Sequence, residues 1–240
     1  MIRPNLRVEK QLFRDGHAVV VGCDEVGRGA LSGPVSVGVV AIDAAVRRVP
    51  DGLADSKLLS PNRREVLAPR VQRWAVDNAV GHAASQEIDR FGIILALRLA
   101  ALRALQQLQV RPDVVVLDGS HDWLTRRWEQ FDLFGDAPDW PEVEIPYVFT
   151  RVKADLHCAA VAGASVLAKT TRDRIMVDLA DRHPEYGWHE NKGYASTQHI
   201  ASLQRYGPCE QHRRSWRLPG LSYTDEADLA NTDIAITDIA

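Results

Sequence analysis

The feature that constrains this chain most is a short apolar run that leads directly into two acids and a glycine-rich turn. Residues 18–21 (AVVV) predict a buried strand, and Asp24 and Glu25 follow it. A Gly-Arg-Gly sequence occupies positions 27–29. Carboxylates at the end of a strand suit hard divalent cations, which prefer oxygen ligands. Glycines let the backbone approach a ligand closely, and an arginine between them can reach a phosphate. The segment therefore indicates a metal site beside a phosphate- and sugar-reading turn.

A second strand with a similar ending lies farther along the chain. Residues 113–117 (DVVVL) predict it, Asp118 follows, and Asp155 precedes a long helical pattern. Neighbouring strands with a common direction would place Asp24 and Asp118 together. Hydrolysis of a phosphodiester needs charge neutralisation, an activated water and a stabilised leaving oxygen, which two divalent ions about 3.5–4 Å apart supply. We therefore group Asp24, Glu25, Asp118 and Asp155 as candidate metal ligands.

The same acids also have a purely structural interpretation. An aspartate after a strand is most often a turn former or a helix cap. In a regular strand, adjacent side chains point to opposite faces, so Asp24 and Glu25 would both bind metal only if the strand bends there. Composition and spacing alone leave the two interpretations about even.

The remaining periodicity predicts an α/β protein. A short connection makes the second strand, at 34–42, the antiparallel neighbour of the first. Ser60 before Pro61 is typical of a helix N-cap, and we expect that helix to end near Trp74. The other predicted elements are helices at 5–14, 86–108 and 156–182 and strands at 79–84 and 147–152.

By composition the chain divides into three predicted parts. Residues 1–182 form the main domain, with an inserted Trp-rich excursion at about 121–143 that we expect to lie outside the core. Residues 183–217 form a basic and aromatic C-terminal segment, and residues 218–240 an acidic tail that we expect to be disordered. Removing the five acids of the tail changes the formal charge from −3 to +2. The slightly basic body permits nucleic acid as a partner without demanding it.

Cysteine usage and hydropathy argue against several other classes. The three cysteines, Cys23, Cys158 and Cys209, are scattered without CxxC spacing, so we expect neither a disulfide framework nor a zinc site. The polar N-terminus lacks the apolar core of a signal peptide, and no apolar run approaches membrane-spanning length. We therefore expect a cytoplasmic protein that does not associate with a membrane.

Taken together, the motifs resemble those of bacterial ribonuclease HII, the type 2 ribonuclease H. They occur in the family's order and cover most of residues 18–217. The matching segments are GCDEVGRGALSGPV (22–35), DSKLLS (55–60), VVLDG (115–119), RVKAD (151–155), ASVLAKTTRD (164–173), NKGYAS (191–196) and YGPCEQHRRSW (206–216). The resemblance implies an α/β ribonuclease H-like fold, with a central mixed β-sheet flanked by helices. It makes residues 1–182 the catalytic domain and 183–217 a small helical substrate-binding segment.

The resemblance also implies Mg²⁺- or Mn²⁺-dependent cleavage of the RNA in RNA–DNA hybrids. The family's characteristic target is a single ribonucleotide in duplex DNA, cut on its 5′ side to leave 3′-hydroxyl and 5′-phosphate ends. Asp24 and Glu25 match the family's adjacent acidic pair, Asp118 the acid of its Asp-Gly motif, and Asp155 its fourth acid. These four residues would be catalytic and would hold two divalent ions. The segment between Asp118 and Asp155 is longer than the family usually has.

Substrate-binding roles follow from the same resemblance. Gly27, Arg28 and Gly29 match the turn that reads the ribose, where only the 2′-hydroxyl separates RNA from DNA. Tyr194 matches a tyrosine placed against the sugar after the cut. Further candidates are Lys57, Lys169 and Lys192 for phosphates, and Ser165, which resembles a serine near the substrate. The structural alternatives are a plain tight turn, a packing tyrosine, solvated lysines and a small helix residue.

The histidines are not assigned as general bases. Metal ions can activate water without a protein base, so His157 has no predicted role. We interpret His212, with Arg213 and Arg214, as fixing the C-terminal segment or a phosphate.

We expect a monomeric ribonuclease that removes ribonucleotides from DNA and needs no obligate protein partner. Two alternatives stay open. A structure-selective DNA nuclease of the same superfamily would use similar acids but would not need the Gly-Arg-Gly turn. A catalytically silent hybrid-binding module would lack one or more of the acids, and all four are present.

Overall fold

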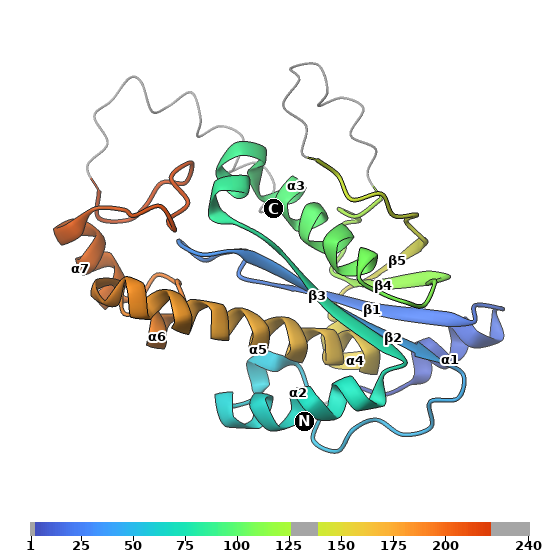
Figure 1. The fold of residues 1–240 in the computed structure, drawn as a ribbon. Helices are drawn as coiled ribbons and strands as arrows, with labels where there is room; N and C mark the ends of the chain where they lie inside the picture. The colour runs from blue at the N-terminus through green and yellow to red at the C-terminus, as the bar shows by residue number, and fades with distance from the viewer. Residues whose placement is uncertain (1–2, 126–138, 222–240) are drawn as a thin grey trace.

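A computed structural model describes residues 3–125 and 139–221 of the 240-residue chain. Its centre is a five-stranded sheet in the order β3-β2-β1-β4-β5, with helices on both faces (Figure 1). β1, β2 and β3 are antiparallel neighbours, while β4 runs parallel to both β1 and β5. The predicted α/β class with a central mixed sheet is confirmed. The strands are β1 (Val19–Val26), β2 (Val35–Asp43), β3 (Asp77–Ala83), β4 (Val114–Asp118) and β5 (Tyr147–Arg151).

The middle of the sheet is formed by β1, whose valines are buried on both faces. Val20 and Val21 point in opposite directions, and both are fully buried. The parallel ladder between β1 and β4 ends where Cys23 lies opposite Leu117. The carboxyl ends of the two strands therefore meet at one edge of the sheet, and each carries an aspartate at the next position.

Three helices cover one face of the sheet, and the longest, α5, packs directly on the strands. A β-carbon on Gly22 would lie 2.2 Å from the carbonyl carbon of Ala160, and one on Gly38 would lie 2.4 Å from the carbonyl oxygen of Ala164. The two glycines let the helix backbone approach β1 and β2 closely, which fixes α5 beside the strand ends. The helices of this face are α1 (Arg7–Arg14), α2 (Pro61–Trp74) and α5 (Ala159–Arg182).

The opposite face packs against α3 (Ser85–Gln106), in which the helix is interrupted at Gly92 by a φ of +77°. The ends of the Trp-rich excursion join this core: Trp123 and Leu124 are buried in the cluster that α3 forms with the sheet. The expectation that the excursion lies outside the core is therefore wrong for its first residues, because their apolar side chains are buried against α3. Residues 126–138 lie outside the described residues.

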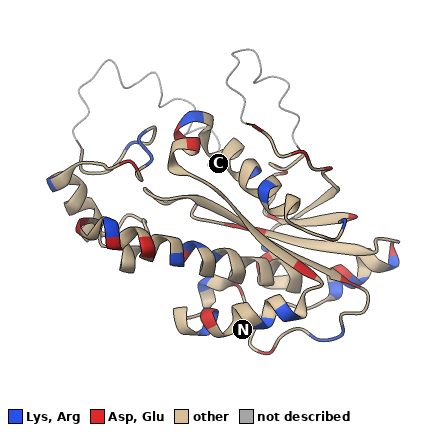
Figure 2. Ribbon diagram, in the orientation of Figure 1, with Lys and Arg blue, Asp and Glu red and all other residues tan. Residues whose placement is uncertain are grey.

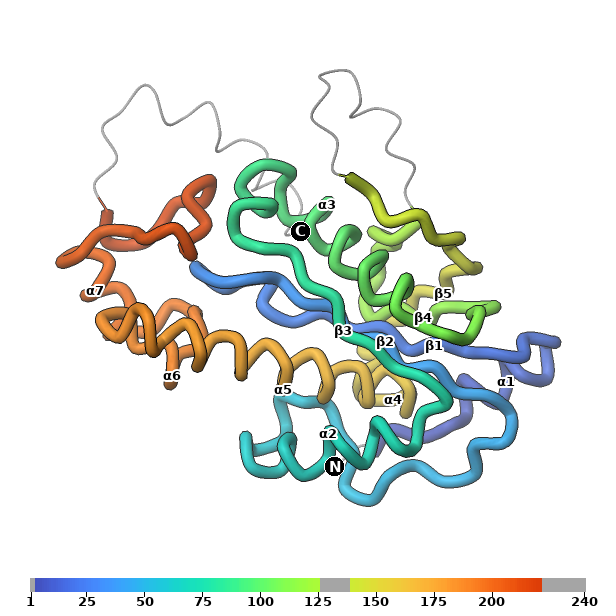
Figure 3. The backbone as a smooth tube through the Cα atoms, in the orientation of Figure 1, coloured from blue at the N-terminus to red at the C-terminus, as the bar shows by residue number. Residues whose placement is uncertain are grey.

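The C-terminal segment packs around the far end of α5 (Figures 1 and 3). Trp188 and Leu203 are fully buried in a small cluster with Met176 of α5. Leu218, the first residue of the predicted tail, is buried in the same cluster, whereas residues 222–240 lie outside the described residues. The elements of the segment are η3 (Pro184–Tyr186), α6 (Trp188–Asn191) and α7 (Thr197–Tyr206).

Two predicted boundaries differ from the structure in ways that matter for the site. β1 extends to Val26, so Asp24 and Glu25 lie within the strand rather than after it. The predicted helix at 156–182 is interrupted: α4 (Ala154–His157) ends at His157, and the extended backbone of Cys158 separates it from α5. The periodicity did not show this break because the alanine-rich pattern continues on both sides of it. The other predicted elements are present with small shifts at their ends.

Charged side chains lie mostly on the helices and loops, and the strands are largely uncharged (Figure 2). The few acids within the strands are therefore conspicuous. Within residues 3–125 and 139–221, no helix is both long and apolar enough to span a membrane.

Candidate active site

The predicted acids meet at the edge where β1 and β4 end. Asp24 lies on β1, Asp118 is the last residue of β4, and Asp155 lies in α4, directly after β5. Asp24 and Asp155 are buried, with exposed fractions of 4% and 6%. Asp118 Oδ1 accepts a hydrogen bond from the backbone N–H of Ala154 at 2.6 Å, which ties β4 to the start of α4. Parallel pairing thus brings together acids that are far apart in the sequence.

Asp24 and Glu25 leave β1 on opposite faces. The ladder with β2 continues through both residues, so the strand does not bend between them. Ser165 of α5 partly offsets the raised pKa of Asp24, whose Oδ1 accepts the N–H of Glu25 at 2.9 Å. Glu25 Oε1 lies 3.8 Å from Nη1 of Arg28. The charge of Asp118 raises the pKa of both carboxylates. The bend that we expected to be necessary for Asp24 and Glu25 to bind metal together is absent from β1.

Burial and mutual repulsion hold the acids in an electrostatically costly state. Burial raises the pKa of Asp24 well above its usual range, and Glu25 raises it further. Burial also raises the pKa of Glu25, which Arg28 partly offsets. The pKa of Asp155 is raised by burial first and then by Asp118. Nearby cations would relieve this repulsion and favour the ionised carboxylates.

The ammonium group of Lys57 is one such cation. Burial alone would lower the pKa of Lys57, but the surrounding carboxylates raise it above its ordinary value. Lys57 is therefore the predicted lysine that the fold places among the acids. The carboxylates that act on it belong to Asp24, Asp55, Asp118 and Asp155.

A short turn, η1 (Ser56–Leu58), positions Lys57. Asp55 caps the turn by accepting the N–H of Lys57 at 3.0 Å. Ser56 Oγ lies 2.9 Å from Oγ of Ser165, which links the turn to α5. Ser165 is buried and supports Asp24 and this turn from within the protein. Asp55 and Ser56 were not predicted as site residues, although they lie in the DSKLLS motif. The partner of Ser56 is distant in sequence and gave no local signal.

Arg213 holds the turn at 27–29 from inside the protein. Its Nη2 donates to the carbonyl oxygen of Gly27 at 2.6 Å and its Nη1 to that of Arg28 at 2.7 Å. Arg213 is fully buried. Burial first, and then Arg172, lowers the pKa of Arg213 to about 9, so the guanidinium remains charged at neutral pH. Of its two predicted roles, Arg213 fixes the C-terminal segment, by joining it to this turn.

Arg172 of α5 holds the other end of the same connection between β1 and β2. It donates to the carbonyl oxygens of Ser32 (3.1 Å), Pro34 (2.8 Å) and Lys192 (2.9 Å). These bonds join the β1–β2 connection to the segment that carries Tyr194. Arg172 was not predicted as a site residue, because its partners are backbone atoms that a sequence motif does not reveal.

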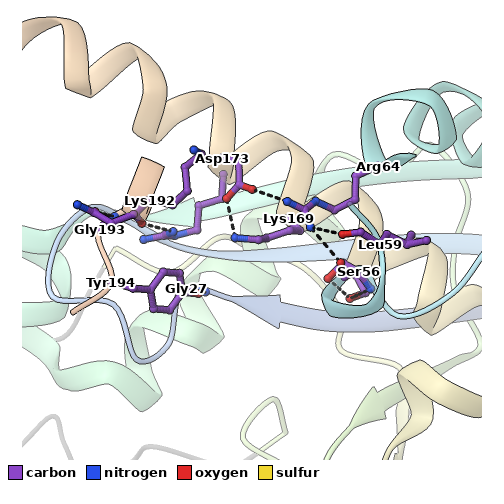
Figure 4. A network of polar contacts seen from close by, with 12 residues as sticks. Gly27, Ser56, Leu59, Arg64, Lys169, Asp173, Lys192, Gly193 and Tyr194 are labelled. Atoms are coloured by element: carbon purple, nitrogen blue, oxygen red, sulfur yellow. Dashed lines mark hydrogen bonds and ion pairs between the residues drawn. The ribbon is translucent and has the colours of Figure 1, made fainter. Parts of the chain in front are cut away.

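Tyr194 reaches the turn directly. Its hydroxyl accepts the N–H of Gly27 at 3.2 Å (Figure 4). Lys169 Nζ and the guanidinium of Arg172 lie 5.5 Å and 5.4 Å from the centre of its ring, which is cation–π distance. Lys169 is also paired with Asp173 at 2.7 Å. Two cations of α5 and the N–H of Gly27 therefore contact the tyrosine side chain.

The fold separates the predicted lysines into two groups. Lys57 lies among the acids, whereas Lys169 and Lys192 lie near Asp173, which also pairs with Arg64 at 3.2 Å (Figure 4). A hollow of about 270 Å³ between α2 and α5 is lined by Arg64, Asp173 and Lys192, among others. None of the four acids lines this hollow, so the chemistry of the acids, and not the hollow, marks the candidate site.

The donor set fits divalent cations. Four carboxylates converge on one sheet edge, and oxygen ligands are those that Mg²⁺ and Mn²⁺ prefer. Three of the four have raised pKa values in the protein without ions, which is the expected result of holding ligands together before their cations bind. The oxygen ligands and the raised pKa values of the predicted acids are therefore compatible with bound divalent cations.

The structural comparisons define the class. The fold is similar to that of ribonuclease H2 from Pyrococcus horikoshii OT3, with a TM-score of 0.64 and 28% identity, over 83% of this chain and 94% of that one. It is also similar to Bst-RNase HIII, solved in complex with Mn²⁺, with a TM-score of 0.56 and 19% identity, over 79% of this chain and 63% of that one. The predicted ribonuclease H-like fold is confirmed.

The sequence comparisons define the family. The family model for Ribonuclease HII matches residues 21–218. Ribonuclease HII of Streptomyces avermitilis is 45% identical over 89% of this chain and 83% of its own length. The enzyme of Paracoccus denitrificans is 44% identical over 89% of this chain and 91% of its own. The chain belongs to the ribonuclease HII family, whose members are divalent-metal-dependent endoribonucleases acting on RNA–DNA hybrids.

Proposed function

We propose that this ribonuclease also cuts duplex DNA on the 5′ side of single embedded ribonucleotides, with two divalent ions, Mg²⁺ or Mn²⁺. One observation carries the proposal: the turn at 27–29 continues directly from the strand that bears Asp24 and Glu25. A group that reads the sugar and groups that hold the metal would then share one rigid element. The distance between ribose and cut would be fixed by β1 itself.

The four acids would hold the ions. When bound, the ions neutralise charge on the phosphate and activate the attacking water. Asp118 is oriented for this role by the Ala154 N–H, and Asp24 by Ser165. Lys57, which is exposed at its turn and faces the acids, would bind a phosphate oxygen of the cleaved strand.

The turn at 27–29 would read the ribose from its outer side. Arg213 binds the carbonyl oxygens of Gly27 and Arg28 from inside, so the other side of the turn faces the substrate. Gly27 is required by the fold, because its φ is +83° and a β-carbon would lie 2.1 Å from Nε of Arg172. The fold does not require a glycine at position 29. A β-carbon on Gly29 would meet nothing within 4 Å, and the φ of Gly29 lies outside the positive range. The space above Gly29 would admit the sugar that carries the 2′-hydroxyl.

Tyr194 would contact the neighbouring sugar. Its hydroxyl accepts the N–H of Gly27, so its ring would lie against the nucleotide next to the ribose that the turn reads. A flat ring at this position tolerates deoxyribose and crowds a 2′-hydroxyl, which would favour junctions between RNA and DNA. Lys169 and Lys192 would bind phosphates on the same side, because both lie near Tyr194 and Asp173.

We further propose that the enzyme acts as a monomer in the cytoplasm, in the removal of ribonucleotides from DNA.

The proposal is tested with three duplexes of one sequence: an RNA–DNA hybrid, duplex DNA with one ribonucleotide, and duplex DNA alone. Each is incubated with Mg²⁺, with Mn²⁺ and with chelator, and the ends of the products are mapped. We expect a metal-dependent nick on the 5′ side of the single ribonucleotide and none in duplex DNA. Cleavage of the all-DNA duplex would favour the structure-selective DNA nuclease. Cleavage of the hybrid with no nick at the single ribonucleotide would contradict the proposed ribose reading.

A further inference from the structure

A second group of metal-ligand side chains lies at the far end of α5. His183, Cys209 and Glu210 each offer one ligand atom, and these atoms all lie within 4.8 Å of one another. We call these residues the His–Cys–Glu cluster. His183 directly follows α5, and the other two lie in the loop after α7. None of the four acids of the candidate active site belongs to the cluster.

The spacing of the ligand atoms suits one tetrahedral ion of the zinc class. Zinc binds thiolate sulfur at about 2.3 Å and imidazole nitrogen or carboxylate oxygen at about 2.0–2.2 Å. Ligand atoms around such an ion lie roughly 3–4 Å apart, by the tetrahedral geometry of those bond lengths. His183 Nε2 already lies 3.1 Å from Oε1 of Glu210. Small side-chain movements would therefore close the cluster around an ion.

An independent observation concerns the other nitrogen of the His183 ring. Its Nδ1 lies 3.6 Å from Oε1 of Glu185. A metal-binding histidine commonly donates its second ring N–H to a carboxylate, which fixes the tautomer and the orientation of the ring. Glu185 and Glu210 thus lie on opposite nitrogens of one imidazole. At 3.6 Å the Glu185 carboxylate is too far for a hydrogen bond to Nδ1, and the proposal requires the ring to move toward it when an ion binds Nε2.

The loop that carries the other two ligands is fixed by the surrounding protein. Ser85 Oγ and Gln86 Nε2 donate to the carbonyl oxygen of Glu210 at 3.2 Å and 2.6 Å. The N–H of Cys209 donates to Nδ1 of His212 at 3.1 Å. Two of the ligand backbones are therefore held before any ion binds, which lowers the entropic cost of binding.

We propose that His183, Cys209 and Glu210 bind a single zinc-class ion, with a fourth position left for water. The ion would join the end of α5 to the loop that leads into Arg213, and so would be a structural link in the C-terminal segment. The sequence predicted no zinc site because the cysteines lack CxxC spacing. The tertiary fold brings the three ligands together, because residues 209–210 lie against the end of α5.

Cobalt provides a probe that is specific for the sulfur ligand. Purified protein freed of metal is titrated with Co²⁺, and the thiolate-to-cobalt absorption band is recorded. An ion held by carboxylates alone produces no such band. Cys23 and Cys158 are fully buried, and Cys158→Ala serves as the control for binding near the other acids. His189→Gln is the matched surface control, because His189 forms an exposed pair with Glu190 at 3.8 Å outside the cluster.

We expect a band at one equivalent of Co²⁺ in the wild type and in both controls, and its loss in Cys209→Ser. Zn²⁺ should displace the Co²⁺, and Glu185→Gln should weaken Zn²⁺ binding about 10- to 100-fold. If Cys209→Ser does not fold, Glu210→Gln at an exposed position tests the cluster instead, and it should lower the affinity for Co²⁺ while the band remains. The absence of a band in the wild type, or a band that survives Cys209→Ser, would overturn the proposal. Unchanged affinity in both His183→Gln and Glu210→Gln would mean adventitious thiol binding only, and would overturn it equally.

Discussion

At the scale of single residues, the two glycines of the turn at 27–29 are under different constraints. Gly27 has a positive φ and lies against Arg172, so the fold requires it. Gly29 has neither constraint. A methyl group at Gly29 is compatible with the folded protein and would enter only the space that we assign to the ribose.

Gly29→Ala therefore separates folding from recognition. We expect a melting temperature close to that of the wild type and a rate of nicking at a single ribonucleotide at least about tenfold lower, which corresponds to about 1.4 kcal/mol. Thermal unfolding and single-turnover cleavage measure the two effects. A fully active Gly29→Ala variant would contradict the placement of the sugar at this turn.

Arg213 acts on the same turn through its guanidinium fork. Lysine cannot reproduce the paired bonds to the carbonyl oxygens of Gly27 and Arg28. A buried carbonyl left without a partner costs about 1–3 kcal/mol. We expect Arg213→Lys to lower both stability and the rate of nicking at a single ribonucleotide, while Mn²⁺ binding at the acids stays unchanged. Arg214→Lys, at the exposed neighbouring position, is the control and should behave as wild type; equal nicking by the two variants would count against the role of Arg213.

The sequence identified most of the candidate residues, but not the tertiary contacts that orient their side chains. The motif pattern predicted that Asp24, Glu25 and the turn belong to one site. Strand alternation predicted that the two acids would point to opposite faces unless the strand bends. The pattern did not predict that β1 stays regular through both residues, nor which face α5 covers. Arg172 and Arg213 bind backbone carbonyl oxygens of distant residues, and such partners leave no signal in a local pattern.

At the scale of elements, the contact of α5 with the sheet determines the position of Ser165 relative to Asp24. Gly22→Ala tests this contact, since its β-carbon would lie 2.2 Å from backbone of Ala160. Overpacking of a core commonly costs about 1–3 kcal/mol, and a backbone clash should reach or exceed the upper end. We expect a loss of that size in denaturant unfolding, with no comparable loss in Gly29→Ala. Wild-type stability of Gly22→Ala would mean that α5 does not pack this closely.

Glu9 connects α1 to the first turn of α5 and predicts a pH dependence. Its Oε1 accepts the N–H of Ala160 at 2.9 Å, and burial raises the pKa of Glu9 to about 7. Between its ordinary value of 4.5 and about 7, the folded protein keeps a proton that the unfolded chain loses. The contribution of Glu9 to stability is therefore fully present below pH 4.5 and falls as the pH rises toward 7.

The substitution Glu9→Gln should remove this pH dependence, because glutamine keeps the acceptor oxygen without the charge. We expect the stability of the wild type relative to Glu9→Gln to fall by up to about 3 kcal/mol between pH 4.5 and 8. Urea unfolding at several pH values measures the difference, and comparison of the two proteins cancels the titration of other groups. A difference that does not change with pH would refute the raised pKa.

Element types were largely predictable from the sequence, whereas the break before α5 was not. Strands such as β4 have valine runs with clear ends, and Ser60 caps α2 as predicted, by accepting the N–H of Arg63. The break at Cys158 separates α4 from α5 and sets the direction of Asp155. It accompanies a left-handed Lys153, with φ of +57°, and the capture of the Ala154 N–H by Asp118. Those tertiary contacts override the helical periodicity of the segment.

At the scale of the whole molecule, the C-terminal segment folds back onto the β1–β2 connection. The N–H of Leu31 donates to Gly193 at 2.8 Å, and the N–H of Gly33 donates to Gln211 at 2.8 Å. The proposed sugar-reading turn is therefore bounded by β1 on one side and by the C-terminal segment on the other. The family resemblance implied a central mixed sheet but not its strand order, and periodicity alone does not specify which distant strands pair.

The most direct test of the account is single-turnover cleavage of duplex DNA with one ribonucleotide by the wild type, Asp24→Asn and Asp118→Asn, with binding measured on the same duplex. We predict a nick on the 5′ side of the ribonucleotide by the wild type with Mg²⁺ or Mn²⁺ and none with chelator. Both variants should bind the duplex with near-normal affinity and fail to cut it. Near-normal cleavage by either variant, or cleavage by the wild type in chelator, would contradict the assignment of these acids as metal ligands.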